Sequence, residues 1–401
     1  MDLHKSFQTI KKPTRILLLC GVMGLFFRVP LFANDRPDEK KLPDELTAGI
    51  VHLLEVVDPA HAKSFKPELV SALLKFIEKP KRSPVLYFAD DATGSPSAYY
   101  EFDVNRSLKH IVSYAFDPDI PDIALTPTST RLSYWKKRED NNINLPLLSD
   151  NLNQSNGPVV LNGLEFIEIT PDSFTGAYYS YDNHRSFILF KYQNHKVLIS
   201  ISKQTDVSSV GKKGYVLGRD ENWDYFYSGE PGLSISGLGW TRSYMYDSYG
   251  INIYYELDHT APLVRCAILH WIRAGWSKIN FVKNHHIYSG LKRFAIPFKT
   301  ILEFPDLPDA DVMARVFSNI SMLSGDILKK KAEDYFTIMK TRYRKQKYDS
   351  AKWPSALFEE KDPWLNMNSE EIKSMLAIEY MKLILGKTQG KEVGALLDLK
   401  P

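Results

Sequence analysis

Apolar and polar residues alternate with a period of two along the middle of the chain, over about residues 85–258. In the segment SAYYEFDV, which begins at Ser97, Ala98 and every second residue after it are apolar and share one face of an extended chain. The segment YGINIYYELD, which ends at Asp258, repeats this pattern. Such alternation is typical of antiparallel strands that pack one face against a core.

Two hairpins are expected within this region. The run VLYFA is separated from SAYYEFDV by DDATGSPS, a stretch rich in turn-forming residues. The runs FILFKY and VLISIS flank QNHK, with Val197, Ile199 and Ile201 on one face of the second strand. A polar stretch, residues 136–157, interrupts the strand pattern and predicts a long exposed loop or insertion.

Helical spacing replaces this alternation on both sides of the region. Before it, two short helices are expected, one ended by Asp58-Pro59 and the next by Pro80. After it, Thr260-Ala-Pro is a start signal for a helix that is expected to be buried against the sheet. The apolar stripe of that helix consists of Val264, Ile268, Trp271, Gly275 and Ile279.

Further helices are expected over residues 291–302, 310–322 and 326–345, and a last one begins at Asn368. Asn368 and Glu371 have the spacing of a capping box, and Gly386 is a stop signal. Strands followed by helices predict an α+β fold, an antiparallel β-sheet core with helices contributed by the N-terminal and C-terminal segments. The expected parts are a signal peptide (1–33), a linker with short helices (34–82), a β-rich domain (83–258) and a helical region (259–401).

The first 33 residues have the order of a secretory signal peptide. A basic start is followed by the twelve-residue apolar run ILLLCGVMGLFF and then by Ala33, just before the polar NDRPDEK. The apolar run is shorter than the ~20 residues that a transmembrane helix needs. Export to the periplasm or the extracellular space, with cleavage after Ala33, is therefore expected, and an uncleaved signal anchor is the alternative.

The formal net charge of +3 comes from this first segment. Residues 1–33 carry five cationic side chains and one aspartate, so the rest of the chain has a net charge of −1. This value removes the electrostatic argument for binding nucleic acid. Cys266 is the one cysteine that follows residue 33, so an intrachain disulfide is not expected in the mature chain.

Familiar catalytic and cofactor motifs are absent from the sequence. It has no GxSxG, no HExxH, no P-loop and no GxGxxG, and its SxxK matches are at background frequency. Cys266 lies in an apolar run and is expected to be buried and inert. The aspartates of AFDPDIPDIA leave a calcium site open, although the two prolines favour a rigid turn. Neither a metal nor a cofactor is therefore predicted.

The stretch from Gly214 to Asp258 holds eleven aromatic residues among 45, about twice the frequency of the whole chain, with acids interleaved. Aromatic rings beside carboxylates suit sugar recognition, and a pair of carboxylates can cleave a glycoside. The same composition also fits turns and half-buried strands. The candidate binding residues are Asp220, Glu221, Trp223, Asp224, Tyr225, Tyr227, Glu230 and Trp240.

A second segment, from Trp271 to Phe294, combines aromatic and cationic residues. It is consistent with a surface for anionic lipid or a partner, although the cationic edge of a core helix is the stronger interpretation.

The sequence therefore favours an exported, non-enzymatic protein that binds a ligand or an envelope partner through this aromatic surface, with a glycan as one candidate. The alternative is a secreted carbohydrate-active or other acid-dependent hydrolase that uses Asp220, Glu221, Asp224 and Glu230. No nucleic-acid partner is expected, and membrane contact is expected only through an uncleaved anchor.

Overall fold

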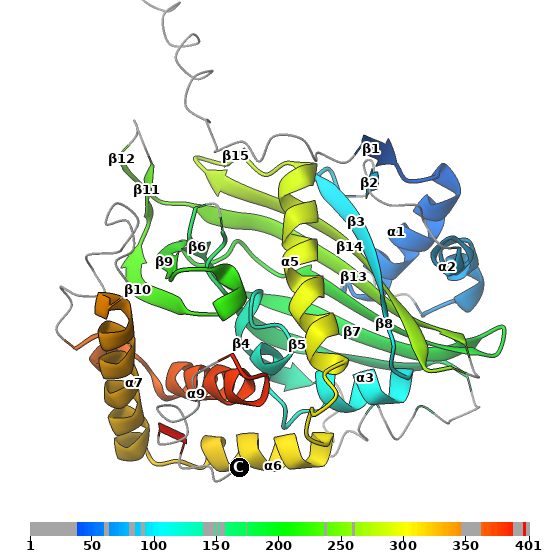
Figure 1. The fold of residues 1–401 in the computed structure, drawn as a ribbon. Coiled ribbons are helices and arrows are strands. Elements are labelled where there is room, and N and C mark those ends of the chain that lie inside the picture. The colour runs from blue at the N-terminus through cyan, green and yellow to red at the C-terminus, as the bar shows by residue number, and fades with distance from the viewer. Residues whose placement is uncertain are drawn as a thin grey trace, which may run out of the picture.

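The computed structural model describes residues 38–59, 64–79, 85–89, 93–138, 148, 152, 157–173, 175–235, 239–258, 261–345, 362–387 and 396–397 (Figure 1). The predicted signal peptide lies outside the described residues, as does most of the predicted polar loop.

One large sheet runs through the molecule (Figure 1). Within the described residues it has ten strands, in the order β1-β2-β3-β14-β13-β8-β7-β5-β4, and β15 pairs with the end of β14. Neighbouring strands are antiparallel, except for the parallel pair β1 and β2. The strands are Asp38–Lys41 (β1), Val85–Phe88 (β2), Ser97–Val104 (β3), Thr130–Arg138 (β4), Val159–Ile169 (β5), Ser180–Tyr192 (β7), His195–Gln204 (β8), Tyr244–Asp258 (β13), Leu263–Trp276 (β14) and Ile279–Asn280 (β15).

Two smaller sheets, β10-β9-β6 and β11-β12, lie beside the large one (Figure 1). Their strands are Ala177–Tyr178 (β6), Lys212–Val216 (β9), Tyr225–Pro231 (β10), Leu233–Ile235 (β11) and Gly239–Thr241 (β12).

The predicted α+β fold, a sheet core with helices from both ends of the chain, is confirmed. The capping box of Asn368 and Glu371 begins the last described long helix, and Gly386 follows that helix with a φ of 65°. A helix that the sequence did not predict begins after Ser107, whose side chain accepts a hydrogen bond from the backbone N–H of His110. The helices are Thr47–Val56 (α1), Ser71–Glu78 (α2), Leu108–Ala115 (α3), Asn284–Leu302 (α5), Ala310–Ser321 (α6), Gly325–Lys345 (α7) and Ser369–Ile384 (α9).

Helices α1 and α2 cover one face of the large sheet. The alternation in β8 directs Val197, Ile199 and Ile201 toward this face, where all three are fully buried. Trp271 of β14 is fully buried in the same apolar cluster. Burial of each large apolar side chain contributes about 1.5–3 kcal/mol, so this face supplies a large part of the fold's stability.

The predicted helix with the stripe Val264, Ile268, Trp271, Gly275 and Ile279 is wrong, because residues 263–276 form strand β14. Leu269 packs in the cluster under α1 and α2, whereas Cys266 packs in the core on the opposite face. A strand that is buried on both faces loses its alternation, so its continuous apolar run also matches a helical stripe. The last strands of the sheet therefore lie beyond residue 258, inside the region that was expected to be helical.

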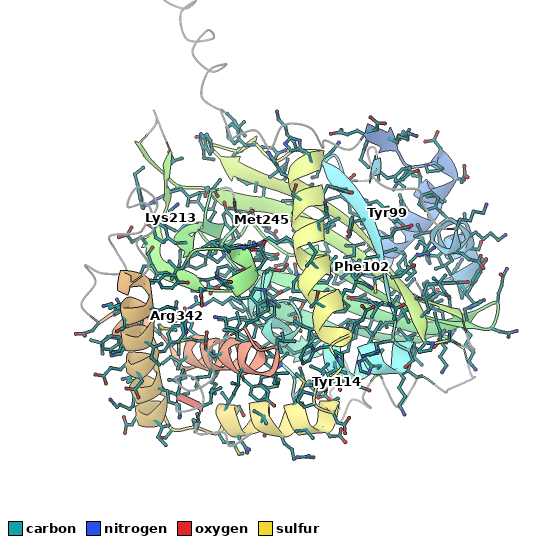
Figure 2. All side chains as sticks on the ribbon, viewed as in Figure 1. Tyr99, Phe102, Tyr114, Lys213, Met245 and Arg342 are labelled. Carbon is teal, nitrogen blue, oxygen red and sulfur yellow. The ribbon has the colours of Figure 1, made fainter. Side chains whose placement is uncertain are left out.

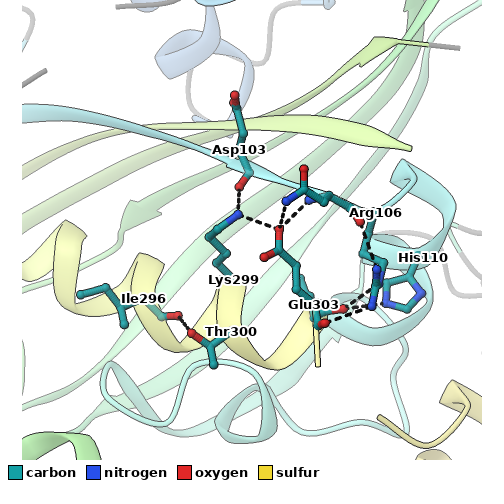
Figure 3. Close-up of polar contacts among 9 residues, drawn as sticks. Asp103, Arg106, His110, Ile296, Lys299, Thr300 and Glu303 are labelled. Carbon is teal, nitrogen blue, oxygen red and sulfur yellow. Dashed lines mark hydrogen bonds and ion pairs between the residues drawn. The ribbon is translucent and has the colours of Figure 1, made fainter. Parts of the chain in front are cut away.

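Helix α5 crosses the other face of the sheet, opposite α1 and α2 (Figure 1). Its C-terminal end is fixed to the turn between β3 and α3 (Figure 3). Lys299 Nζ donates to the carbonyl oxygen of Asp103 at 2.5 Å and to Glu303 Oε1 at 2.6 Å. Arg106 Nε donates to the carbonyl oxygen of Leu302 at 3.0 Å, one of the carbonyls that a helix end leaves without an intrahelical partner.

A proline inside α5 creates a second anchor. Because Pro297 has no N–H, the carbonyl of Arg293, four residues earlier, has no hydrogen-bond partner within the helix. Thr128 Oγ1 donates to this carbonyl at 2.7 Å. The guanidinium of Arg293 also holds the Asp220 carboxylate, at 2.6 and 2.7 Å. The middle of α5 is thus tied to two segments from elsewhere in the chain.

We expect Thr128→Val to lower the free energy of unfolding by about 1–3 kcal/mol, because the Arg293 carbonyl loses a donor while the side-chain shape is kept. Thr300→Val is the matched control, since the Thr300 hydroxyl bonds the Ile296 carbonyl on the exposed side of the same helix (Figure 3). That control should change stability by less than about 0.5 kcal/mol. Denaturant unfolding measures both, and equal losses would contradict the anchoring role of Thr128.

Candidate ligand-binding cavity

The face of the sheet under α5 changes from apolar to polar along the strands. One cross-strand row packs in the core with the helices of that side and consists of Leu189, Leu198, Tyr254 and Cys266. Two rows further along, the register aligns small and polar residues, namely Arg185, Ser202, Gly250 and His270. The row between these two is mixed and consists of Phe187, Ser200, Asn252 and Ile268.

A cavity of about 2100 Å³ lies over these rows, between the sheet and α5. The segment from Tyr114 to Thr130 forms much of a second wall. Tyr114, Lys213 and Met245, which line the cavity, lie on different sides of α5 in Figure 2. Typical small-molecule pockets measure about 300–1000 Å³, so this cavity is large enough for a long or branched ligand.

A polar belt crosses the floor of the cavity. It consists of Asp122, Ser133, Glu165, Arg185, Ser200, Ser202, Ser248, Asn252 and His270. At its centre, Arg185 donates to Glu165 Oε2 from Nε at 2.8 Å and from Nη2 at 2.6 Å. Arg185 Nη1 also donates to Ser200 Oγ at 3.3 Å. The strongest charge of the belt is therefore already paired.

Burial shifts the acids of the belt toward their neutral forms. It raises the pKa of Glu165, although the charge of Arg185 acts in the opposite direction. Burial likewise raises the pKa of Asp122, against the effects of a hydrogen bond with Ser133 and of Arg185. Carboxyl groups in such surroundings carry less negative charge than they would in water.

His270 lies at the other side of the polar belt, and its side chain is neutral at pH 7. Burial lowers its pKa to about 4, and the positive charge of Arg185 acts in the same direction. Its Nε2 lies 3.0 Å from Ser248 Oγ, and Tyr181 bonds the same hydroxyl. A serine beside a histidine can be a nucleophile and its base. Here the low basicity of His270 favours hydrogen bonding to a ligand over proton abstraction.

The floor is open partly because residue 250 has no side chain. A Cβ at Gly250 would lie 2.8 Å from Ser202 Oγ and 3.9 Å from the His270 ring. A larger residue there would fill the space between these two polar groups.

The cavity has an apolar region on each side of the polar belt. The region near α3, here called the α3 end, includes Phe116, Leu125, Leu161 and Phe187. The opposite region, here called the β15 end, includes Leu233, Met245, Trp276 and Phe281. At the β15 end the rings of Trp276 and Phe281 stack with centroids 3.8 Å apart.

The four carboxylates that the sequence singled out lie in different surroundings. Asp220 accepts from Arg293 and from the hydroxyl of Tyr225, the latter at 2.8 Å. Glu221 and Glu230 are exposed, and Glu221 pairs with Arg219 at 3.2 Å. None of the four carboxylates is among the described residues that line the large cavity.

Asp224 belongs to a buried ionic network beneath α9. Lys382 Nζ lies 2.7 Å from Asp224 and 2.5 Å from Glu379, and all three side chains are at most 5% exposed. Tyr343 donates to Asp224 at 2.6 Å. Although burial lowers the pKa of Lys382, Glu379 and Asp224 outweigh it and raise that pKa overall.

The aromatic candidates mostly pack inside the protein. Trp223 and Tyr225 are buried, and Lys387 lies 4.4 Å from the centre of the Trp223 ring. Arg131 lies 3.7 Å from the centre of the Tyr227 ring. These three aromatic residues line a small cavity of about 50 Å³. Trp240 is 54% exposed and donates to the carbonyl of Pro231 at 2.8 Å. A binding role for this stretch stays a prediction.

The sequence reasoning missed the cavity residues, although their signal was present. In β8 the residues that alternate with Ile199 and Ile201 are Ser200 and Ser202. Alternate polar residues normally face solvent. On a sheet that is covered on both faces, they instead indicate a polar interior surface.

Comparisons with known proteins give no match: no family model fits the chain, and neither a curated protein nor a solved structure is significantly similar to it. Among the described residues, no group of three or more histidine, cysteine or acidic side chains is arranged to hold a metal ion. No helix within the described ranges is long and apolar enough to span a membrane.

We expect Lys382→Met to lower the free energy of unfolding by about 3–5 kcal/mol, because Asp224 and Glu379 would be left as uncompensated buried carboxylates. Lys373→Met is the matched control on the same helix, since Lys373 pairs with the exposed Glu370. The control should change stability by at most about 1 kcal/mol in denaturant unfolding. A small loss in Lys382→Met would show that the network is not structural.

The depressed pKa of His270 predicts a pH dependence of stability. Its pKa is about 4 in the folded protein and ~6.5 when unfolded, so the folded state binds fewer protons between these values. Stability from this group is complete above about pH 6.5 and falls by about 3 kcal/mol as the pH drops toward 4. Unfolding curves of His270→Gln over this range should therefore have a shallower pH slope than those of the wild type. An unchanged slope would contradict the assignment of a buried neutral imidazole.

Proposed function

We propose that the protein binds a large, mostly apolar ligand in the cavity between the sheet and α5, and releases it unchanged. The observation that carries this proposal is the cavity of about 2100 Å³ with a paired polar belt between two apolar ends. Protein interiors are normally packed as densely as organic crystals. A large space over a floor of serine and glycine residues is therefore a feature that the sequence maintains at a cost in stability.

The geometry of the Ser248–His270 pair supports binding more than hydrolysis. Both residues lie within long strands whose backbone groups pair in the sheet. An oxyanion formed at Ser248 would need donors that are free to receive it. The carboxylates of Asp220, Glu221 and Asp224 have separate partners, and Glu230 is exposed. These positions likewise give no support to a hydrolase that uses the four carboxylates.

The proposed binding site is the cavity and not the aromatic surface, but part of the Gly214–Asp258 stretch lines this cavity. Strand β13 contributes Met245, Ser248, Gly250, Asn252 and Tyr254 to the lining. Export is also part of the proposal, and its support is the basic, apolar and small-residue order of residues 1–33. A carrier or receptor outside the cytoplasm would meet apolar molecules that have left a membrane.

Blocking the exposed edge of the cavity at α5 tests whether ligands bind there. Gly290 of α5 is exposed and lines the cavity, and a Cβ there would meet no atom within 4 Å. We expect Gly290→Trp to weaken binding of the uncharged fluorescent dye N-phenylnaphthylamine by about tenfold, because the indole would obstruct entry. Fluorescence titration of the full chain measures this affinity.

Gly325→Trp is the matched control. Gly325 is also helical with open space at its Cβ position, and it does not line the cavity. The Gly325→Trp variant should bind the dye with the affinity of the wild type. No saturable dye binding by the wild type, or equal weakening in both variants, would overturn the proposed function.

A further inference from the structure

The two arginines that line the cavity are paired with carboxylates of the protein. Among its described lining residues are the cations Arg185, Lys213 and Arg293 and the acids Asp117, Asp122, Glu165 and Asp172. Glu165 holds Arg185, and Asp220 holds Arg293. Lys213 donates to the carbonyl of Thr175 at 2.8 Å, and burial lowers its pKa. An anionic ligand would find no excess of positive charge in these surroundings.

An anionic head group on the polar belt would also be costly. It would have to displace Glu165 from Arg185, and the released carboxylate would remain buried. Moving an ion out of water costs several kcal/mol unless new partners compensate it. The belt instead offers neutral hydrogen-bonding groups, including the hydroxyls of Ser200 and Ser202 and the amide of Asn252.

One acceptor beside the belt has no hydrogen-bond partner among the described residues. Asn183 lines the cavity, and its buried Oδ1 makes no hydrogen bond within the described part of the chain. An unpaired buried acceptor favours a ligand that brings a donor, such as a hydroxyl or amide group.

The position of the belt constrains the shape of the ligand. Along β13, the lining extends from Met245 at the β15 end to Tyr254 beside the α3 end. Nine residue steps in a strand span about 30 Å. The belt residues Ser248, Gly250 and Asn252 lie between these limits, so apolar surface is available on both sides of the polar groups.

We propose that the ligand is an uncharged lipid with two apolar arms and a central hydroxyl, ester or amide group that lies on the polar belt. One arm occupies the α3 end and the other occupies the β15 end. This inference rests on the proposed function and adds the charge and shape of the ligand.

A matched pair of probes tests the charge. Anilinonaphthalene sulfonate has the ring system of N-phenylnaphthylamine with an added anionic group. We expect the wild type to bind the uncharged N-phenylnaphthylamine at least about tenfold more tightly than the sulfonate. Equal or tighter binding of the sulfonate would overturn the inference.

Glu165→Gln should reduce this preference for the uncharged dye. It leaves the charge of Arg185 without its carboxylate, so affinity for the sulfonate should rise by about tenfold while affinity for the uncharged dye changes little. Glu168→Gln is the control on the same strand, since Glu168 pairs with Arg131 and does not line the cavity. An equal gain in both variants would contradict the role of Glu165. If Glu165→Gln does not fold, the wild-type comparison of the two dyes decides the question.

Competition against the uncharged dye tests the two arms. We expect dioleoylglycerol to displace it at about tenfold lower concentration than either monooleoylglycerol or oleate. Ala115 lines the α3 end and Ala274 lines the β15 end. A leucine at either position should therefore weaken the binding of dioleoylglycerol more than the binding of monooleoylglycerol. Dye binding that Gly290→Trp weakens, without any competition by dioleoylglycerol, would refute this inference while the proposed function stands. Absence of dye binding would refute both.

Discussion

Helix α5 can lie across the polar face of the sheet because its own polar groups find partners outside the helix. Pro297 frees the Arg293 carbonyl, Thr128 binds it, and the Arg293 side chain holds Asp220. At the C-terminal end, the contacts of Lys299 and Arg106 fix the helix to the turn after β3 (Figure 3). On one side, α5 packs against β3 and β14, where Ile287, Tyr288 and Leu291 share an apolar cluster with Ala98 and Ile268. The cavity lies beside this contact, over the strands that carry the polar belt.

The two faces of the sheet differ in how polar their buried side chains are. Under α1 and α2, isoleucine, valine and tryptophan side chains form a buried apolar cluster. Under α5, buried charges and hydroxyls replace them, and groups such as Arg185 and Glu165 must be paired to be tolerated at all. Binding sites commonly use groups of this kind, whose positions are fixed by pairing within the protein.

Three residues of the aromatic, acidic stretch that stands out in the sequence make structural contacts with distant segments. Asp220 anchors α5, Asp224 lies in the buried network of α9, and Trp223 packs under Lys387. Each of these residues joins the small sheet of β9 and β10 to a helix from a distant part of the chain. Composition alone does not separate this role from ligand binding, since rings and carboxylates suit both.

Local sequence determined the features that depend on near neighbours. A few adjacent residues determine the turn at Gln193 and Asn194, both with positive φ, and the capping box at Asn368. The alternation along β8 likewise determines which of its residues share a face. Tertiary structure decided the rest. Strand β14 resembled a helix because burial on both faces removed its alternation. The polar belt exists because the strand register places Arg185, Ser202, Gly250 and His270 side by side, and register depends on pairing between strands that are far apart in the sequence.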